Sequence, residues 1–225
     1  MTNQSHLSES VEMYLKTLAA LEDGGAPVPI AHVAARLAVS PVSAGEMMQR
    51  LGRDGLVSHL PHKGVTLTPD GRQLAHDVIR RERLWEVLLH DRLGLPWARV
   101  HAWACQLEHA TAPEVSEALD SFLGFPAACP QGNAIPRGDE PAAALPLLND
   151  LPLGQPARLA AFEDESEEVL VYLHKRGLVP GELVTVTEVA PRQGPLTLRL
   201  ASGAEQVIGT SLAATIRVRP EAEPA

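Results

Sequence analysis

Three short helices followed by a β-hairpin are predicted within the first 68 residues, and few folds begin in this order. Apolar residues recur at helical spacing over 8–22, which predicts an amphipathic helix. A second, shorter helix begins at Pro29. Ser40 is placed to cap a third helix over 41–53, since proline is favoured at a first helical position such as that of Pro41.

The hairpin comes directly after the third helix. Two short apolar runs, 56–60 and 65–68, flank a turn that contains Pro61 and Gly64. Three helices and a two-stranded wing form a winged helix-turn-helix, a fold that places its recognition helix in the major groove of DNA. We therefore predict a winged helix-turn-helix DNA-binding domain over residues 1–74.

The middle of the chain is predicted to be helical. Three helices are expected, over 69–93, 97–111 and 113–123. Gly94 and Pro96 separate the first from the second, and residues 124–156 are irregular and rich in proline and alanine. We expect a helical domain over 75–145 and a linker over 146–156.

Residues 157–225 change from helical to alternating patterns. Short strands are expected over 157–162, 183–189, 196–200, 206–208 and 214–218, with one helix over 166–175. Short strands separated by glycine and proline turns are typical of a small barrel. The predicted fold class is therefore α+β, with a winged helix, a helical middle domain and a C-terminal β-barrel.

Several function classes are made improbable by features that the sequence lacks. The N-terminus has no basic and apolar leader, and no apolar run reaches the length of about 20 residues that spans a bilayer. The two cysteines, Cys105 and Cys129, make no disulfide framework and favour free thiols or metal ligands in a reducing cytosol. No HExxH, GxSxG or phosphate loop occurs, so we expect a cytoplasmic protein that is not an enzyme.

The net charge of −9 is unevenly distributed along the chain. Residues 1–92 hold 10 Lys or Arg and 11 Asp or Glu, a balance of −1, whereas residues 93–225 hold 9 and 17, a balance of −8. A nucleic-acid binder usually carries a basic surface. Divalent cations bound in the acidic part would cancel much of its charge, so a negative total fits a protein that leaves DNA when it is metal-free.

A group of metal-ligating residue types lies on the predicted helix 97–111. Cys105, Glu108 and His109 stand at i, i+3 and i+4 and share one helix face, with His101 one turn earlier. A thiolate, a carboxylate and imidazoles suit transition metals. The preceding helix carries a pair of carboxylates at i and i+4, Glu82 and Glu86, which predicts a second group if it meets a histidine of the next helix.

Two runs and one loop resemble the diphtheria toxin repressor family of iron- and manganese-dependent transcriptional regulators. The runs are Glu12-Met13-Tyr14-Leu15 and Val100–His109, and the loop is Cys129–Pro136. The resemblance covers nearly the whole chain and implies an SH3-like (FeoA-like) domain over 157–225. It implies a homodimeric repressor of metal-uptake genes that binds operator DNA when Mn²⁺ or Fe²⁺ is bound.

The resemblance implies two metal sites and one anion site per chain. The activating metal site would use Met13, Cys105, Glu108 and His109. The ancillary metal site would use Glu82, Glu86, His101, Glu165 and Glu168. An anion beside the ancillary metal would be held by Arg83 and Asn133. An ion bound by both Met13 and the middle helices would hold two recognition helices about 34 Å apart, the spacing of successive major grooves.

The sequence departs from the family at two of these places. Glu82 stands where the family commonly has histidine, so the ancillary set holds four carboxylates and one imidazole, a hard set that suits Mn²⁺ or Fe²⁺. Met13 and Cys105 are softer and favour Fe²⁺, Co²⁺ or Ni²⁺. The loop reads CPQGNAIP where CPHGNPIP is frequent in the family, which puts the anion site in question.

DNA contacts are expected from the start of the third helix and from the tip of the wing. The candidate residues are Ser40, Pro41, Val42, Ser43, Glu46, Arg50, His62 and Lys63. Few of them are strong base readers, so DNA shape would contribute to sequence readout. The alternative function is a winged-helix repressor that senses a small organic ligand, which would need an apolar pocket and would keep its DNA binding in a chelator.

Overall fold

The computed structural model describes residues 8–22, 25–137 and 145–221. The chain divides into two compact units, one of residues 1–81 with 136–140 and one of residues 82–135 with 141–225. Each unit is described by itself. No helix within the described residues is long and apolar enough to cross a membrane.

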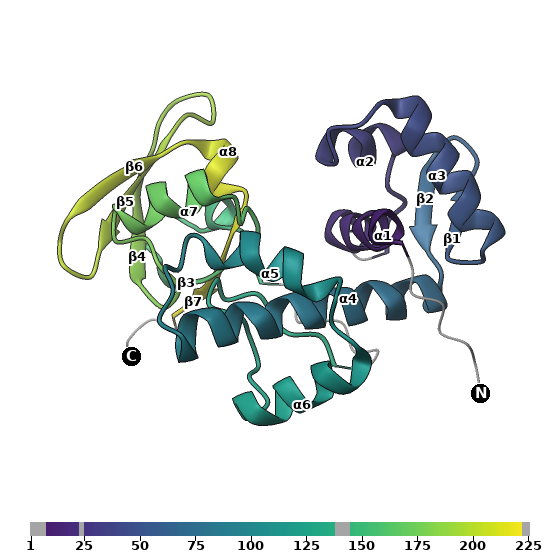
Figure 1. Ribbon diagram of the computed structural model, residues 1–225. Helices are drawn as coiled ribbons and strands as arrows, with labels where there is room; N and C mark the ends of the chain where they lie inside the picture. Colours follow the sequence, from purple (N-terminus) through teal and green to yellow (C-terminus); the bar gives the residue numbers. More distant parts are fainter. Residues whose placement is uncertain (1–7, 23–24, 138–144, 222–225) are drawn as a thin grey trace. The chain divides into compact units, whose positions relative to one another are not determined.

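The first unit is a winged helix-turn-helix (Figure 1). Its elements are α1 (Glu9–Leu21), α2 (Ile30–Arg36), α3 (Pro41–Arg53), β1 (Val57–Leu60) and β2 (Gly64–Leu67). The strands pair antiparallel. Their shared core contains Leu15, Leu18, Val33, Met48, Leu51 and Val65, all completely buried. The helices and the wing of the sequence prediction are therefore present.

Helix α3 begins where its capping residue predicts. The side-chain oxygen of Ser40 accepts a hydrogen bond from the backbone N–H of Ser43 at 3.0 Å, and Pro41 occupies the first turn. Such a cap satisfies one of the amides that a helix leaves unpaired at its start. Ala44 and Met48 anchor the buried side of α3, which leaves Glu46 on the exposed side.

The wing is held against the start of α2 by backbone pairing. Val28 and Val65 form an isolated antiparallel bridge. Gly64 has a φ of +122°, and a Cβ there would lie 2.1 Å from the carbonyl oxygen of Val28. Only glycine allows this close approach, so Gly64 fixes the position of the wing.

Two ion pairs connect α1 with α4 (Pro69–Val87) inside the first unit. Glu22 accepts hydrogen bonds from Arg72 and from the backbone N–H of Leu67. The Arg81 guanidinium donates to Glu12 at 2.6 Å, and both side chains are mostly buried. These contacts balance the carboxylates that the apolar face of α1 carries inward.

Helix α4 continues past Arg81 into the second unit, which also contains helices α5 (Val100–Glu108) and α6 (Pro113–Leu123). The end of the predicted helix 69–93 is a π-helical turn, η1 (Leu88–Arg92). The predicted helix 97–111 is shorter, because Trp97 lies in a turn before it. The indole of Trp97 donates to the Pro130 carbonyl at 2.9 Å and packs edge-on against Phe162.

The C-terminal part of the second unit is a five-stranded antiparallel sheet that forms a small barrel (Figure 1). The strands are β3 (Pro156–Phe162), β4 (Leu183–Val189), β5 (Leu196–Leu200), β6 (Glu205–Ile208) and β7 (Ile216–Pro220), in the order β6-β5-β4-β3-β7. Helix α7 (Glu167–His174) follows β3, and a short helix α8 (Thr210–Ala213), which the sequence did not predict, precedes β7.

The core of the barrel extends into the segment predicted as a linker. Leu148, in the 3-10 turn η2 (Leu148–Asp150), is completely buried, and Leu151 is nearly so. Both pack in the same cluster as Phe162 and the inward side chains of the strands. Residues 147–151 are thus part of the barrel in the structure.

Candidate metal centre

Two neighbouring helices of the second unit supply the side chains of the candidate metal centre. Glu82 and Glu86 stand one turn apart on α4, and His101 and Cys105 stand one turn apart on α5. Residues at i and i+4 share a helix face, so each helix presents a pair. Glu82 is 4 % exposed and Glu86 is fully buried, an unusual position for two carboxylates.

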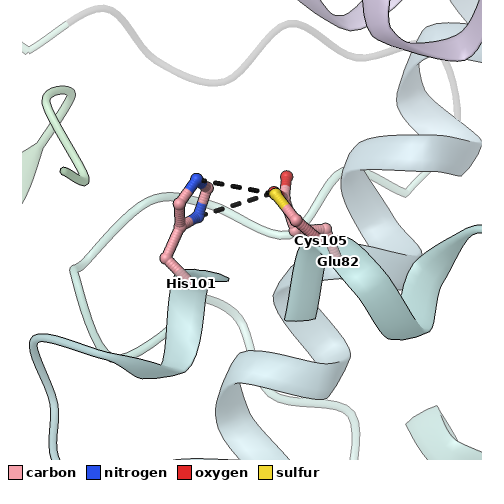
Figure 2. A group of neighbouring side chains, drawn as sticks. All are labelled: Glu82, His101 and Cys105. Atoms are coloured by element: carbon pink, nitrogen blue, oxygen red, sulfur yellow. Dashed lines mark hydrogen bonds and ion pairs between the residues drawn. The ribbon is translucent and has the colours of Figure 1, made fainter. Parts of the chain in front are cut away.

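Glu82, His101 and Cys105 form the first group of candidate ligands (Figure 2). The Cys105 thiol donates to Glu82 Oε1 at 2.8 Å, and its Sγ lies 3.7 Å from His101 Nε2. His101 Nδ1 lies 3.5 Å from the same carboxylate oxygen. A thiol, an imidazole and a carboxylate therefore meet at one point between α4 and α5.

Glu86, His101 and Glu165 form a second group that shares the imidazole with the first. His101 Nδ1 lies 2.8 Å from Glu86 Oε1 and 3.1 Å from Glu165 Oε2. Glu165 lies between β3 and α7, so the barrel contributes a ligand to the helical centre. The sequence could place Glu165 here only through the family resemblance.

The electrostatics of the centre are those of a site with surplus negative charge. Burial raises the pKa of Glu86 to about 7, and repulsion from Glu165 adds to the rise. Burial alone would lower the pKa of His101, but hydrogen bonds to Cys105, Glu165 and Glu86 outweigh it, and the pKa of His101 is raised. Both shifts show carboxylates that hold protons for want of another positive charge.

The residues of the centre fit a divalent cation. Oε2 of Glu86 is buried and has no hydrogen-bond partner among the described residues, which is costly unless a cation binds there. Carboxylate oxygens, imidazole nitrogen and thiolate sulfur are all established ligands of transition metals. Such an ion would neutralise the repulsion that raises the pKa of Glu86.

A loop over 128–135 positions Glu165. Asn133 donates to Glu165 Oε1 at 2.6 Å and to the Phe162 carbonyl at 2.8 Å. The backbone N–H of Phe162 donates to the Gln131 carbonyl at 3.0 Å. Gly132 has a φ of +87°, and a Cβ there would lie 1.8 Å from the carbonyl oxygen of Ala160. Glycine at this position thus allows the loop to lie directly against β3.

The two residues predicted to bind an anion contact protein groups in the structure. Arg83 donates to the carbonyl of Ala134, and Asn133 donates to Glu165. Both contacts stabilise the loop and the candidate ligand Glu165. Their role toward an anion stays a prediction.

The remaining predicted ligands are less closely associated with this centre. Glu108 is completely buried, and His109 Nε2 lies 3.8 Å from its Oε1. Glu168 is exposed in the first turn of α7, and none of the histidine–carboxylate contacts found within the described residues involves it. Met13 is half-buried on α1, in the first unit. The assignment of these residues as ligands stays a prediction.

Sequence reasoning grouped Cys105 with Glu108 and His109 and missed its contact with Glu82. The spacing of His101 and Cys105, which is also i and i+4, was the available signal. What the sequence could not supply is the register of α4 against α5, which decides which carboxylate the thiol meets.

The predicted DNA-contacting residues lie where a DNA surface requires them, on the exposed side of the first unit. The exposed members are Ser40, Pro41, Val42, Ser43, Glu46, Arg50, His62 and Lys63. Arg50 is held loosely by Asp54 at 3.9 Å, with both side chains more than half exposed. Which of them reads bases stays a prediction.

Comparison with known domain families divides the chain into three matches. Residues 6–65 match "Iron dependent repressor, N-terminal DNA binding domain". Residues 68–137 match "Iron dependent repressor, metal binding and dimerisation domain". Residues 147–220 match the FeoA domain. The matches follow the three parts of the predicted α+β architecture.

Curated relatives are similar along most of the chain. The iron-dependent repressor IdeR of Mycobacterium tuberculosis is 36 % identical over 204 residues, which cover 84 % of this chain and 88 % of that protein. The diphtheria toxin repressor of Corynebacterium diphtheriae is 33 % identical over 225 residues, which cover 94 % and 97 %.

Solved structures of similar fold carry the same description. A manganese-dependent transcriptional repressor in complex with manganese matches with a TM-score of 0.84 and 31 % identity, and covers 94 % of this chain and 100 % of its own. ScaR with bound Zn²⁺ matches with a TM-score of 0.83 and 29 % identity, and covers 93 % and 98 %. These relatives support a metal-dependent repressor over a sensor of organic ligands, and the resemblance inferred from the sequence is confirmed. The chain belongs to the iron-dependent repressor family, with a DNA-binding domain, a metal-binding and dimerisation domain and a FeoA domain.

Proposed function

We propose that this chain is a homodimeric repressor that binds operator DNA when divalent Mn²⁺ or Fe²⁺ occupies its middle helices. The observation that carries the proposal is the buried group of Glu82, Glu86, His101, Cys105 and Glu165 in a chain that also contains a winged helix. A family of metal-dependent repressors supplies the link between the two.

We propose two metal sites per chain. The ancillary site would be formed by Glu82, Glu86, His101, Glu165 and Glu168, and the activating site by Met13, Cys105, Glu108 and His109. The contacts of His101 with Glu86 and Glu165 support the first. The burial of Glu108 beside His109 supports the second. Met13 enters from the sequence alone.

The cytoplasm is the proposed location, and regulation of metal-uptake genes rather than catalysis is the proposed role. A bound divalent cation would supply positive charge and directional bonds to the buried carboxylates. In its absence Glu86 holds a proton and His101 is pinned by carboxylates on one side. The two states differ in charge at the same residues, and a ligand that fits only one state shifts the population toward it.

The exposed apolar surface of α6 is proposed to contact the second copy of the chain. Phe122 is 68 % exposed and Val115 is 48 % exposed, although both lie in a helix whose other side is packed. Phe125, just after the helix, is exposed as well. Exposed apolar residues grouped in this way are typical of an interface between subunits, and this helix lies in the part of the chain that matches a dimerisation domain.

The test is DNA binding in the presence and absence of metal. A duplex is first selected from a random pool by the wild-type protein in Mn²⁺, and its affinity is then measured by fluorescence anisotropy with Mn²⁺, with Fe²⁺ under anaerobic conditions, and with EDTA. We expect specific binding with either metal and loss of it in EDTA. Equal affinity in all three conditions contradicts the proposed function.

A further inference from the structure

We propose that Cys105 serves as a thiolate ligand of a centre with Glu82 and His101, so that this centre prefers borderline cations such as Fe²⁺, Co²⁺ or Zn²⁺ over Mn²⁺. The inference rests on the proposed function, because it names the metal class of one of its sites. It changes the partner of the thiol from the Glu108–His109 pair to Glu82 and His101.

The separations between the three ligand atoms support a common ion. Ligand atoms around a tetrahedral ion with bonds of about 2.0–2.3 Å lie roughly 3.3–3.8 Å apart. Cys105 Sγ lies 3.7 Å from His101 Nε2, and His101 Nδ1 lies 3.5 Å from Glu82 Oε1. The shorter Cys105–Glu82 separation, 2.8 Å, is that of a hydrogen bond. When the sulfur binds a cation, the thiol proton leaves to solvent and the carboxylate can bind the same ion.

The two ring nitrogens of His101 face different groups. Nδ1 lies 2.8 Å from Glu86 Oε1 and 3.1 Å from Glu165 Oε2, whereas Nε2 faces the sulfur of Cys105. A histidine that binds a metal usually donates its other N–H to a carboxylate, which orients the ring and makes it a better ligand. With Nδ1–H donated to Glu86, the lone pair of Nε2 points to the side of Cys105.

The chemistry of this set differs from that of a carboxylate-rich site. Carboxylate and water oxygens suit Mn²⁺, whereas thiolate and imidazole ligands favour softer cations. Glu82 is 4 % exposed and Cys105 is half-buried, so the centre is partly shielded from water. A thiolate in such a place gains more from a borderline cation than from a hard one.

The experiment is a Co²⁺ titration of the full-length, metal-free dimer, followed by absorption. A thiolate bound to Co²⁺ gives a charge-transfer band in the near ultraviolet, which carboxylates and imidazoles do not give. Cys105→Ser removes the band and Cys129→Ser, the other cysteine, keeps it. Glu82→Gln is expected to weaken Co²⁺ binding at the band by about 10-fold or more, whereas His109→Ala leaves the band in place.

The opposite pattern overturns the proposal. If His109→Ala removes the band and Glu82→Gln keeps it, the thiolate belongs with Glu108 and His109. A band that Cys129→Ser removes would assign the wrong cysteine. Circular dichroism of every variant shows whether it is folded.

A second measurement needs no variant. Crystals of the wild-type protein soaked in Co²⁺ should show an anomalous difference peak bonded to the Cys105 sulfur, His101 Nε2 and the Glu82 carboxylate. A peak bonded to the sulfur but to neither of the others overturns the proposal. The proposed function fails separately, through DNA binding that is indifferent to EDTA, wherever the thiolate-bound ion lies.

Discussion

The winged helix and the metal centre bury opposite kinds of side chain. The core of the first unit consists of residues such as Leu15, Val33 and Met48, and its charged groups stay near the surface or in ion pairs. The metal centre buries Glu82, Glu86 and Glu108 almost completely. One region is stable by apolar burial, while the other keeps carboxylates out of water at a free-energy cost.

This difference teaches where the chain can respond to its surroundings. An apolar core has the same energy with or without a metal ion. Buried carboxylates are destabilising when they repel each other, and a divalent cation reverses the sign of that interaction. The region with the poorer packing chemistry is thus the one that can sense metal, and the region with the better packing chemistry can present a constant surface to DNA.

The largest effect is expected from removing ligands without touching the winged helix. Glu108→Ala with His109→Ala should lower affinity for the selected duplex in Mn²⁺ by about 100-fold, because metal would no longer favour the DNA-binding state. Fluorescence anisotropy measures the change. Glu114→Ala, a charge removed from the first turn of α6, is the control. A double variant with unchanged metal-dependent affinity would refute these two ligands.

The comparison also predicts a pH dependence in the metal-free protein. The pKa of Glu86 is raised from 4.5 to about 7, so its contribution to stability is fully present below pH 4.5 and is lost as the pH rises through about 7. We expect the free energy of unfolding in EDTA to fall by on the order of 1–3 kcal/mol over this window. Chemical denaturation at a series of pH values measures it.

Glu86→Gln is the matched variant, since it keeps the shape and removes the titration. Its metal-free stability should be flatter over the same pH range. Saturating Mn²⁺ should remove the fall in the wild type. An equal pH dependence in wild type and variant would show that another group is responsible.

Two neighbouring glutamates separate a buried from an exposed position. Glu165→Gln should lower metal affinity by about 10-fold, because Glu165 contacts His101 and is held by Asn133. Glu168→Gln changes the same charge at an exposed site and is expected to have a smaller effect. Isothermal titration with Mn²⁺ measures both, and an equal or larger loss in Glu168→Gln would restore the prediction that Glu168 is a ligand.

The smallest effect concerns the constant surface of the winged helix. Lys63 is exposed beside the tip of the wing and is expected to contact a phosphate. Lys63→Ala should weaken binding to all sequences alike and reduce the salt slope of the affinity by about 1. The metal dependence should stay unchanged, and a variant that lost it would contradict the separation of the two regions.

The winged helix is predictable from the sequence because its signals are local. The cap at Ser40, the proline at 41 and the glycine at 64 each specify a conformation within a few residues. The metal centre is only partly predictable in this way. Spacing on one helix identifies pairs of ligand types, but the contact of Cys105 with Glu82 depends on the register between two helices.

The barrel shows the same limit. Its strands alternate and are predicted to within a few residues, yet Glu165 belongs to the centre only because a distant loop is held against β3. The start of α5 is displaced from the predicted position because Trp97 binds the Pro130 carbonyl and Phe162. Contacts between residues far apart in sequence decide both outcomes.

The loop over 128–135 has a practical consequence for anyone who shortens this protein. Gln131 is fully buried and its carbonyl is satisfied by the amide of Phe162, while Asn133 reaches across to Glu165. Ending the chain before β3 would take away a candidate ligand and strip these polar groups of their partners at the same time. A truncated version that still bound DNA would therefore be a sensor with a different coordination sphere, and its metal preference should not be read back onto the intact protein.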